Sequence, residues 1–145
     1  MKKIYLGSDH GGFELKEHIV GYLISMGHDV IDLGTRSTES VDYPYFGREV
    51  AKAVVSDNAM GIIVCGTGIG ISIAANKVSG ARAALCHCVE YAKLSRQHNN
   101  ANILALGGRF IDEVLAFEIV EAFLETEFEG GRHEKRVADI ENING

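Results

Sequence analysis

The chain has 145 residues, of which 46% are hydrophobic and 23% are charged, and its formal net charge is −6. This length suits one domain over residues 1–145 with a core of its own, and the composition is typical of a soluble globular protein. The negative charge offers no basic field to a nucleic-acid backbone, and no apolar run is long enough to span a membrane. We therefore expect a cytoplasmic protein with no nucleic-acid or membrane partner.

Apolar runs that are typical of strands alternate along the chain with segments of helical periodicity. The expected strands are residues 2–7, 28–34, 60–66, 81–86 and 102–108. The expected helices are residues 13–27, a segment that contains Phe46, Val50, Ala53 and Val54, and residues 71–78, 89–97 and 111–126. One face of the first helix is formed by Leu15, Ile19, Leu23 and Met26. A polar loop over 36–44 precedes the second helix, and a C-terminal segment that is first basic and then mixed completes the chain.

Five strands with helices between them predict an α/β fold, namely a single-domain Rossmann-like three-layer α/β/α sandwich with a five-stranded parallel sheet. The run 60–66 is apolar on both faces, as in a parallel sheet that helices cover on both sides. In this architecture ligands bind outside the carboxyl ends of the strands. Polar residues follow those ends at 8–10, 65–70 and 107–109, and we expect them to line one crevice.

A glycine loop, GTGIG at 66–70, follows the third expected strand and leads into a helix near Ile71. Glycine lets the backbone turn its N–H groups into a concave surface, and the helix N-terminus adds positive potential, which suits a phosphate or an enolate-like oxyanion. A tight connection that needs glycine only for its turn is the alternative. The spacing excludes the dinucleotide fingerprint and the Walker loop, because Ile71 stands in place of the third glycine and no lysine precedes Lys77.

Cys65 closes the third expected strand directly before this loop. A thiol beside a helix N-terminus is favoured as the thiolate, so we expect its pKa to fall from about 8.5 toward neutrality. A group poised near the working pH is a competent general base. A small buried apolar residue is the other interpretation, and both stay open at this point.

The other two cysteines flank His87 in the sequence CHC at 86–88. On an extended strand Cys86 and Cys88 would share one face and His87 would point away, and no second ligand pair follows at zinc-finger spacing. Since the number of cysteines is odd, we expect free core thiols rather than a disulfide framework or a zinc site.

The segments GSDHGGFELK, VDYP, CGTGIGISIAANK, LSRQHNNANILALGGR and EGGRHEKRV together resemble the ribose-5-phosphate isomerase B family, whose fold the galactose-6-phosphate isomerase subunits share. The similarity extends from residue 3 to near residue 140. It implies an aldose–ketose isomerase of the pentose phosphate pathway that interconverts ribose 5-phosphate and ribulose 5-phosphate through a cis-enediolate, without a metal or another cofactor. Family members use as base either a cysteine at the end of strand three or an acidic residue after the glycine loop. Here that later position is Ile71, which favours Cys65.

The resemblance also implies a role for each matching residue. The catalytic residues would be Cys65 as the base, His98 as the acid–base group for ring opening, Thr67 as an oxyanion donor beside the loop N–H groups, and Asp9 as a contact to sugar hydroxyls or an aid in ring opening. The remaining residues would bind the substrate. They are Gly66, Gly68, Ile69 and Gly70 around the oxyanion, Asn99 and Tyr43 at the sugar, and His10, Arg109, Arg132 and Arg136 at the phosphate.

Simpler interpretations remain for some of these residues and for the whole protein. Asp9 could cap the following helix, and His98 could be a surface histidine at a helix end. Arg132 and Arg136, four positions apart, could form a solvated basic face. The alternative functions are an isomerase of a six-carbon sugar phosphate, such as allose 6-phosphate or galactose 6-phosphate, and a phosphate- or nucleotide-binding module without turnover. No role is expected for His18, His28, His87 and His133.

The family is dimeric, so the resemblance implies a homodimer, or else a homotetramer, with sites shared between subunits. The segment 130–145 would pack on the partner subunit. By the same analogy two sets of residues would meet across the interface. They are His98, Asn99 and Arg109 of one subunit and Asp9, Cys65 and Arg132 of the other.

Overall fold

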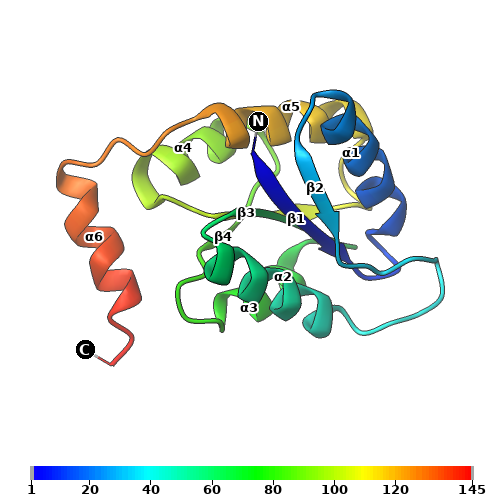
Figure 1. The fold of residues 1–145 in the computed structure, drawn as a ribbon, viewed down its shortest axis with the longest axis horizontal. Helices are drawn as coiled ribbons and strands as arrows, with labels where there is room; N and C mark the ends of the chain where they lie inside the picture. Colours follow the sequence, from blue (N-terminus) through cyan, green and yellow to red (C-terminus); the bar gives the residue numbers. More distant parts are fainter. Residues whose placement is uncertain (1, 145) are drawn as a thin grey trace.

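The middle layer of the structure is a parallel sheet of five strands (Figure 1). The computed structural model describes residues 2–144. The strands are β1 (Lys3–Ser8), β2 (Asp29–Asp32), β3 (Met60–Cys65), β4 (Ala83–Leu85) and β5 (Ile103–Gly107). Their order across the sheet is β2-β1-β3-β5-β4, and every neighbouring pair is parallel. The predicted five-stranded parallel sheet is confirmed.

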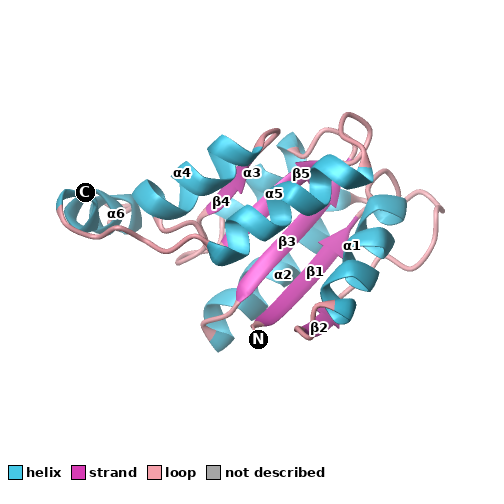
Figure 2. Ribbon diagram, turned by 90° about the horizontal axis from the view of Figure 1, so that it is seen from above, coloured by secondary structure: helices cyan, strands magenta, loops and turns pink. Residues whose placement is uncertain are grey.

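Helices cover both faces of this sheet. They are α1 (Phe13–Ser25), α2 (Tyr43–Asp57), α3 (Ile69–Asn76), α4 (Val89–Asn99), α5 (Glu113–Glu125) and α6 (Arg132–Glu141). On one face α5 packs against both α1 and α4, and on the other face α2 packs against α3 (Figure 1, Figure 2). α6 lies beyond the sandwich and contacts α4 (Figure 1). The predicted three-layer α/β/α architecture is confirmed.

Strand β3 is buried on both faces, and its alternation fixes the direction of its last side chain. Ile62 and Val64 belong to the core that α1 and α5 cover, whereas Ile63 and Cys65 belong to the core that α2 and α3 cover. This division follows from the period of two along a strand. Cys65 therefore ends the central strand with its side chain on the α3 side of the sheet.

Several element boundaries differ from the prediction. α3 begins at Ile69 rather than near Ile71, because Gly68 adopts a φ of +81° as its N-cap and lets the chain enter the helix at once. α2 begins at Tyr43, inside the predicted 36–44 loop, because proline is well suited to a first helical turn. Met26 follows the last turn of α1 and is exposed rather than buried with the other apolar residues of that face.

The prediction for the CHC segment is wrong about the strand and about Cys88, but not about Cys86. β4 is three residues long and ends at Leu85, so Cys86 and Cys88 do not share a strand face. Cys86 is buried, whereas Cys88 is exposed and serves as the N-cap of α4. All three cysteines are free thiols, as expected, but Cys88 is not a core thiol.

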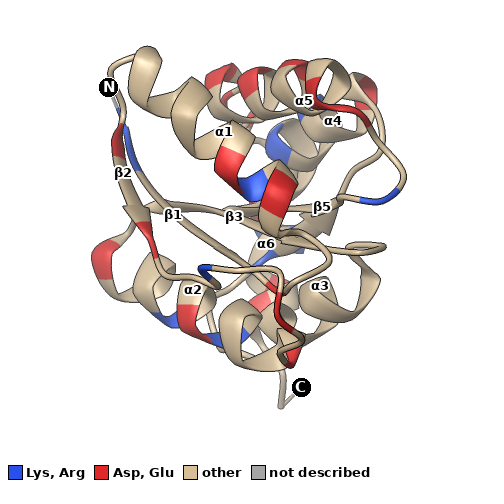
Figure 3. Cartoon of the chain, turned by 90° about the vertical axis from the view of Figure 1, so that its right-hand side faces the viewer, with Lys and Arg blue, Asp and Glu red and all other residues tan. Residues whose placement is uncertain are grey.

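The charged surface is uneven. The exposed side of α5 carries Glu113, Glu118, Glu121 and Glu125, and the red segments of α5 in Figure 3 mark acidic residues along this helix. α6 instead begins with basic residues, which include Arg132 and Arg136, and both arginines are exposed. None of the helices in residues 2–144 is long and apolar enough to cross a membrane.

One lysine is built into the core beside α1. The side chain of Lys16 is fully buried, and its ammonium pairs with Asp32 at 2.7 Å and with Glu17 at 3.0 Å. Removing the Asp32 charge leaves a buried cation poorly compensated, whereas replacing the lysine with an apolar chain of similar volume removes the cation itself. We expect Asp32→Asn to lower the free energy of unfolding by about 3 kcal/mol and Lys16→Met to lower it by much less, as measured by urea denaturation at one chain concentration.

Lys52→Met is the control for this comparison. It removes an exposed lysine that pairs with Glu49 at 3.6 Å, and it should change the free energy of unfolding little. Equal losses for Asp32→Asn and Lys16→Met would contradict this account of the buried pair.

Candidate active site

Three loops meet at the carboxyl edge of the sheet. The loop after β5 is tied to the loop after β3, since Gly108 N donates to Cys65 O at 2.8 Å and Arg109 N donates to a loop carbonyl at 3.1 Å. The turn after β1 joins them, because Asp9 N donates to a β3 carbonyl at 3.3 Å. β1 and β3 are neighbours from which the chain proceeds to opposite edges of the sheet, and such switch points are where these folds bind ligands. The three predicted segments thus lie together.

Cys65 is the last residue of β3 and lies buried at this edge of the sheet. It is 4% exposed, and its sulfur accepts a hydrogen bond from Gly68 N at 3.1 Å. A backbone N–H aimed at the sulfur from the N-terminus of α3 stabilises negative charge on that atom more than it stabilises a neutral thiol. Cys65 is therefore both a buried strand end and a sulfur that faces a helix N-terminus, which are the two interpretations that the sequence left open.

The glycine loop is a tight turn as well as a source of N–H groups. A Cβ at Gly68 would lie 2.5 Å from a Leu85 methyl group and 2.9 Å from a β5 carbonyl oxygen, so the loop can pack against the sheet only with glycine there. The N–H of Ile69 bonds to Thr67 Oγ1 at 3.1 Å, and that of Gly68 is held by the sulfur. Since the first N–H groups of a helix have no partner within it, those of Gly70 and Ile71 remain for an anion.

Thr67, Tyr43 and Arg109 surround the loop. Thr67 is exposed, and its hydroxyl accepts from Ile69 N, so its own proton is free for a ligand oxygen. The ring of Tyr43 covers Gly70, where a Cβ would lie 2.5 Å from the ring. The guanidinium of Arg109 lies over the loop, 3.0 Å from the position of a Cβ at Gly66. A charged donor, a phenol and a hydroxyl thus lie at one loop.

His10 and Asp9 follow β1 at the same edge. Nδ1 of His10 accepts a hydrogen bond from Val41 N at 3.1 Å, which leaves the ring proton on Nε2 as a donor. Asp9 is 8% exposed, and its Oδ1 accepts from Gly12 N at 3.0 Å in the turn that leads into α1. Asp9 therefore does shape the start of the helix, as the simpler interpretation held, and its second carboxylate oxygen is still an acceptor.

His98 and Asn99 lie at the opposite edge of the sheet. They end α4, and the chain then reaches Asn102, whose carbonyl accepts from Gly61 N at 2.9 Å near the start of β3. Cys65 is at the other end of β3, and the five steps from Met60 to Cys65 span about 16 Å at 3.3 Å per residue. The predicted site residues of one chain therefore form two groups.

The membership of the two groups corrects the predicted division. Arg109 lies with Cys65, not with His98, because its guanidinium rests on the glycine loop. Arg132 lies with His98, not with Cys65, because it is the first residue of α6 and the next residue stacks on His98. Arg136 is one helical turn further along α6, as its i,i+4 spacing predicted. We call Asp9, His10, Tyr43, the 65–70 loop and Arg109 the sulfur half, and His98, Asn99, Arg132 and Arg136 the histidine half.

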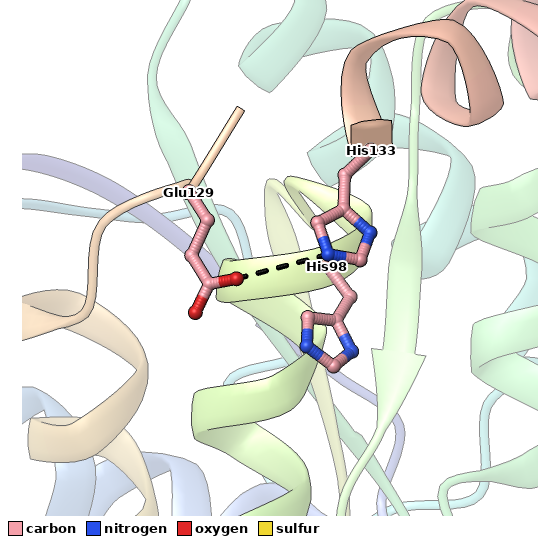
Figure 4. A group of neighbouring side chains, drawn as sticks. All are labelled: His98, Glu129 and His133. Atoms are coloured by element: carbon pink, nitrogen blue, oxygen red, sulfur yellow. Dashed lines mark ion pairs between the residues drawn. The ribbon is translucent and has the colours of Figure 1, made fainter. Parts of the chain in front are cut away.

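His133 is a neighbour that the sequence did not single out. Its ring is stacked on that of His98, with the centroids 4.4 Å apart, and its Nε2 lies 3.7 Å from Glu129 Oε1 (Figure 4). Burial lowers the pKa of His133 below its ordinary value, and nearby His98 and Arg132 lower it further. The i,i+4 spacing of Glu129 and His133 was the available signal, but their pairing with His98 depends on how α6 meets α4.

Known proteins resemble this chain over almost its whole length. A family model described as ribose/galactose isomerase matches residues 4–140. The ribose-5-phosphate isomerase B of Escherichia coli is 51% identical over 144 residues, which are 99% of this chain and 97% of that protein. The chain belongs to the ribose/galactose isomerase family.

Solved structures of the family agree with this fold. Ribose-5-phosphate isomerase B of Clostridium thermocellum has a TM-score of 0.96 at 55% identity, with 98% of this chain and 97% of that chain covered. The enzyme of Mycoplasma genitalium, solved with bound ribulose-5-phosphate, has a TM-score of 0.94 at 41% identity and covers 98% of this chain and 95% of its own. The predicted family, fold and isomerase class are confirmed.

The thiols of Cys86 and Cys88 should react very differently with iodoacetamide. Burial raises the pKa of the Cys86 thiol to about 11, so at pH 8 only about one part in a thousand of it is the reactive thiolate. We expect Cys88, which is exposed, to be alkylated readily at pH 8 and Cys86 to stay unmodified until the chain unfolds, as read by peptide mass spectrometry. Alkylation of Cys86 in the folded protein at a rate close to that of Cys88 would contradict the burial.

Proposed function

We propose that this protein interconverts ribose 5-phosphate and ribulose 5-phosphate with Cys65 as the base, in sites that two copies of the chain build together. The observation that carries the proposal is the hydrogen bond from Gly68 N to the sulfur of Cys65 beside the N-terminus of α3. The names of the Escherichia coli and Clostridium thermocellum relatives, and the ribulose-5-phosphate in the Mycoplasma genitalium structure, support the choice of substrate.

The central step is a proton transfer between neighbouring carbons. The Cys65 thiolate removes the proton from C2 of the open-chain aldose, the C2–H electron pair becomes the C1–C2 double bond, and the negative charge moves to the oxygen on C1. The thiol then returns the proton to C1, the hydroxyl proton on the C2 oxygen passes to the oxygen on C1, and C2 becomes the carbonyl carbon of the ketose without net oxidation. A positioned base of this kind accounts for about 10²–10⁴ in rate.

The oxyanion of the enediolate needs donors beside the sulfur. The N–H groups of Gly70 and Ile71 point from the first turn of α3, and the hydroxyl of Thr67 can donate its proton. Loss of one such donor typically costs about 3 kcal/mol of transition-state stabilisation. The same loop thus stabilises the thiolate before the proton transfer and the enediolate after it.

Ring opening and phosphate binding need the histidine half. Opening the furanose requires a proton on the ring oxygen and removal of the proton from the C1 hydroxyl, and His98 performs this exchange while Asn99 and Asp9 bind sugar oxygens. His10 Nε2–H and Arg109 donate to the phosphate from the sulfur half. Arg132 and Arg136 donate from α6, where their like charges on one face favour a shared anion.

These roles cannot all be filled by one copy of the chain. The sulfur and histidine halves lie at opposite edges of the sheet, about a strand length apart, while a five-carbon sugar phosphate must touch both. A two-fold symmetric dimer joins the sulfur half of each copy to the histidine half of the other and so makes two complete sites. The position of α6, outside the sandwich, supports its packing on a partner, and a homotetramer would repeat the same pairing (Figure 1).

A six-carbon sugar phosphate is the second candidate substrate, because the family model also covers galactose isomerases. Pocket depth depends on the segment 36–44 and on Tyr43, which closes one side of the loop. The third possibility is a binding module without turnover, which would have the same fold. Cys65 would then have no chemical role, and its replacement would leave the function unchanged.

Replacing the sulfur should abolish turnover while sparing binding. We expect Cys65→Ala to lower kcat by about 10²–10⁴, because the base is lost, and to change the affinity for ribulose 5-phosphate little in calorimetric titrations. Cys88→Ala, which removes an exposed thiol, is the control and should keep full activity. Undiminished turnover in Cys65→Ala would refute the base assignment and would favour the binding module.

Mixing two inactive variants should restore activity if each site takes one half from each copy. After co-refolding Cys65→Ala with His98→Asn at equal amounts, half of the dimers are mixed and each has one intact site, so we expect about one quarter of the wild-type activity.

The mixture of Cys65→Ala with Arg109→Gln is the matched control. Both changes fall in the sulfur half, so no intact site can form and the mixture should remain inactive. Recovery in this control, or none in the first mixture, would contradict the division into halves that the geometry of Arg109 supports.

A further inference from the structure

The side chains of His98, Glu129 and His133 converge as three possible metal ligands, which the isomerisation does not require. Within residues 2–144 this cluster is the one group of three histidine, cysteine or acidic side chains whose donor atoms all lie within 4.8 Å of one another. Figure 4 shows the two rings stacked, with the carboxylate of Glu129 directed at His133. Two imidazoles and one carboxylate are the donor set that zinc uses in open, three-ligand sites.

The backbone around the cluster is fixed. Glu129 N donates to Gln97 O at 3.1 Å, which holds the segment before α6 against the end of α4. His133 N donates to Gly130 O at 3.1 Å in the turn that starts α6. Two of the ligands thus come from one hydrogen-bonded turn and the third from the helix end to which that turn is bonded.

His133 also carries an unsatisfied atom that points into the cluster. Its side chain is 6% exposed, and its Nε2 is buried without a hydrogen-bond partner in the part of the chain that the structure describes, since Glu129 Oε1 is 3.7 Å away. Buried polar atoms almost always have a partner, and a lone one in a native structure points to a bound ion, a bound water or a function. A metal ion between Nε2 and the carboxylate would satisfy both groups.

The distances are close to those of a metal site. Zinc–nitrogen bonds of 2.0–2.1 Å put the ligand atoms of a tetrahedral site about 3.3 Å apart. The pair of Glu129 and His133 is already near this value at 3.7 Å. The two rings are 13° from parallel, so His98 must tilt to direct a nitrogen at the same ion, and it is only partly buried at the end of its helix.

We propose that His98, Glu129 and His133 bind a divalent transition-metal ion of the zinc type, and that this ion inhibits the enzyme by occupying the nitrogen of His98 that ring opening needs. The second half of this statement rests on the proposed function. The negative end of the α4 dipole favours a cation here, while the positive charges of Arg132 and Arg136 oppose it. The site therefore binds the ion with moderate affinity, and the binding is reversible. The cluster is thus an inhibitory metal site, and the ion takes no part in the isomerisation.

Zinc binding is tested directly on the full-length chain. Calorimetric titration with Zn²⁺ in a Cys65→Ser, Cys88→Ser background, which removes the two more accessible thiols, should show one ion per chain. Adding Glu129→Gln or His133→Asn should weaken binding by about tenfold or more, because each removes a ligand. Glu129 is exposed, so Glu129→Gln tests the site even if the buried His133→Asn disturbs folding.

His18→Asn is the matched control for this titration. His18 also faces a carboxylate, with Nδ1 3.0 Å from Glu113 Oε2, but no second histidine within the described residues 2–144 completes a cluster there. It should leave Zn²⁺ affinity unchanged. Equal affinity in wild type and Glu129→Gln would overturn the site, whatever the catalytic role of His98.

Inhibition is measured separately, with native cysteines. Zn²⁺ should reduce isomerase activity in the concentration range in which it binds, and Glu129→Gln should shift that range upward by the same factor relative to its own metal-free rate. If Glu129→Gln is inhibited by the same Zn²⁺ concentrations as the wild type, the inhibiting ion binds elsewhere, for example at Cys65, and the proposed inhibitory role of the cluster is wrong. If Zn²⁺ binding depends on Glu129 but activity is not inhibited, the inhibitory role is also wrong. That result would count against the role of His98 in ring opening, although the metal site itself would be supported.

Discussion

The N–H of Gly68 that meets the sulfur of Cys65 is the contact on which the rest of this molecule depends. It exists because β3 ends with its side chain toward α3 and because Gly68 takes a left-handed φ that no bulkier residue adopts without strain. The same turn brings the loop so close to β5 that a Cβ there would overlap a carbonyl oxygen. One backbone turn therefore sets the position of the proposed base, the direction of the helix N-terminus and the packing of the sheet edge.

The sequence predicts the fold well because local patterns carry it. Alternating strands and helices, and a third strand that is apolar on both faces, suffice for a parallel sheet with two helical layers. Boundaries are missed where one residue decides them, as Gly68 does for α3 and Pro44 does for α2. The CHC segment is misread because β4 pairs with only the first three residues of β5 and ends at Leu85, although the apolar run in the sequence continues to Cys86.

The site is predictable only in part, for a geometric reason. Residues that follow strand ends can be placed from the sequence, since the carboxyl ends of parallel strands share one edge. Residues at the end of α4 and on α6 cannot be placed in this way, because their positions depend on how these two helices pack against each other and against the sheet. Arg109 and Arg132 both belong to motifs of the family, yet only the contacts of the first with the glycine loop and the closeness of the second to His98 assign them to different halves. His133 shows the same limit, because its partner on α4 is 35 positions away in the sequence.

The separation of the two halves at opposite edges of one sheet has an evolutionary consequence. If each site takes one half from each copy, as proposed, every copy in an assembly of identical chains must keep both halves intact. If the gene were duplicated and the products paired, one copy could lose its sulfur and the other its helix-end histidine, and a working pocket would persist at one of the two junctions. The architecture thus permits drift toward an obligate pair of unlike subunits, in which neither product is an enzyme by itself.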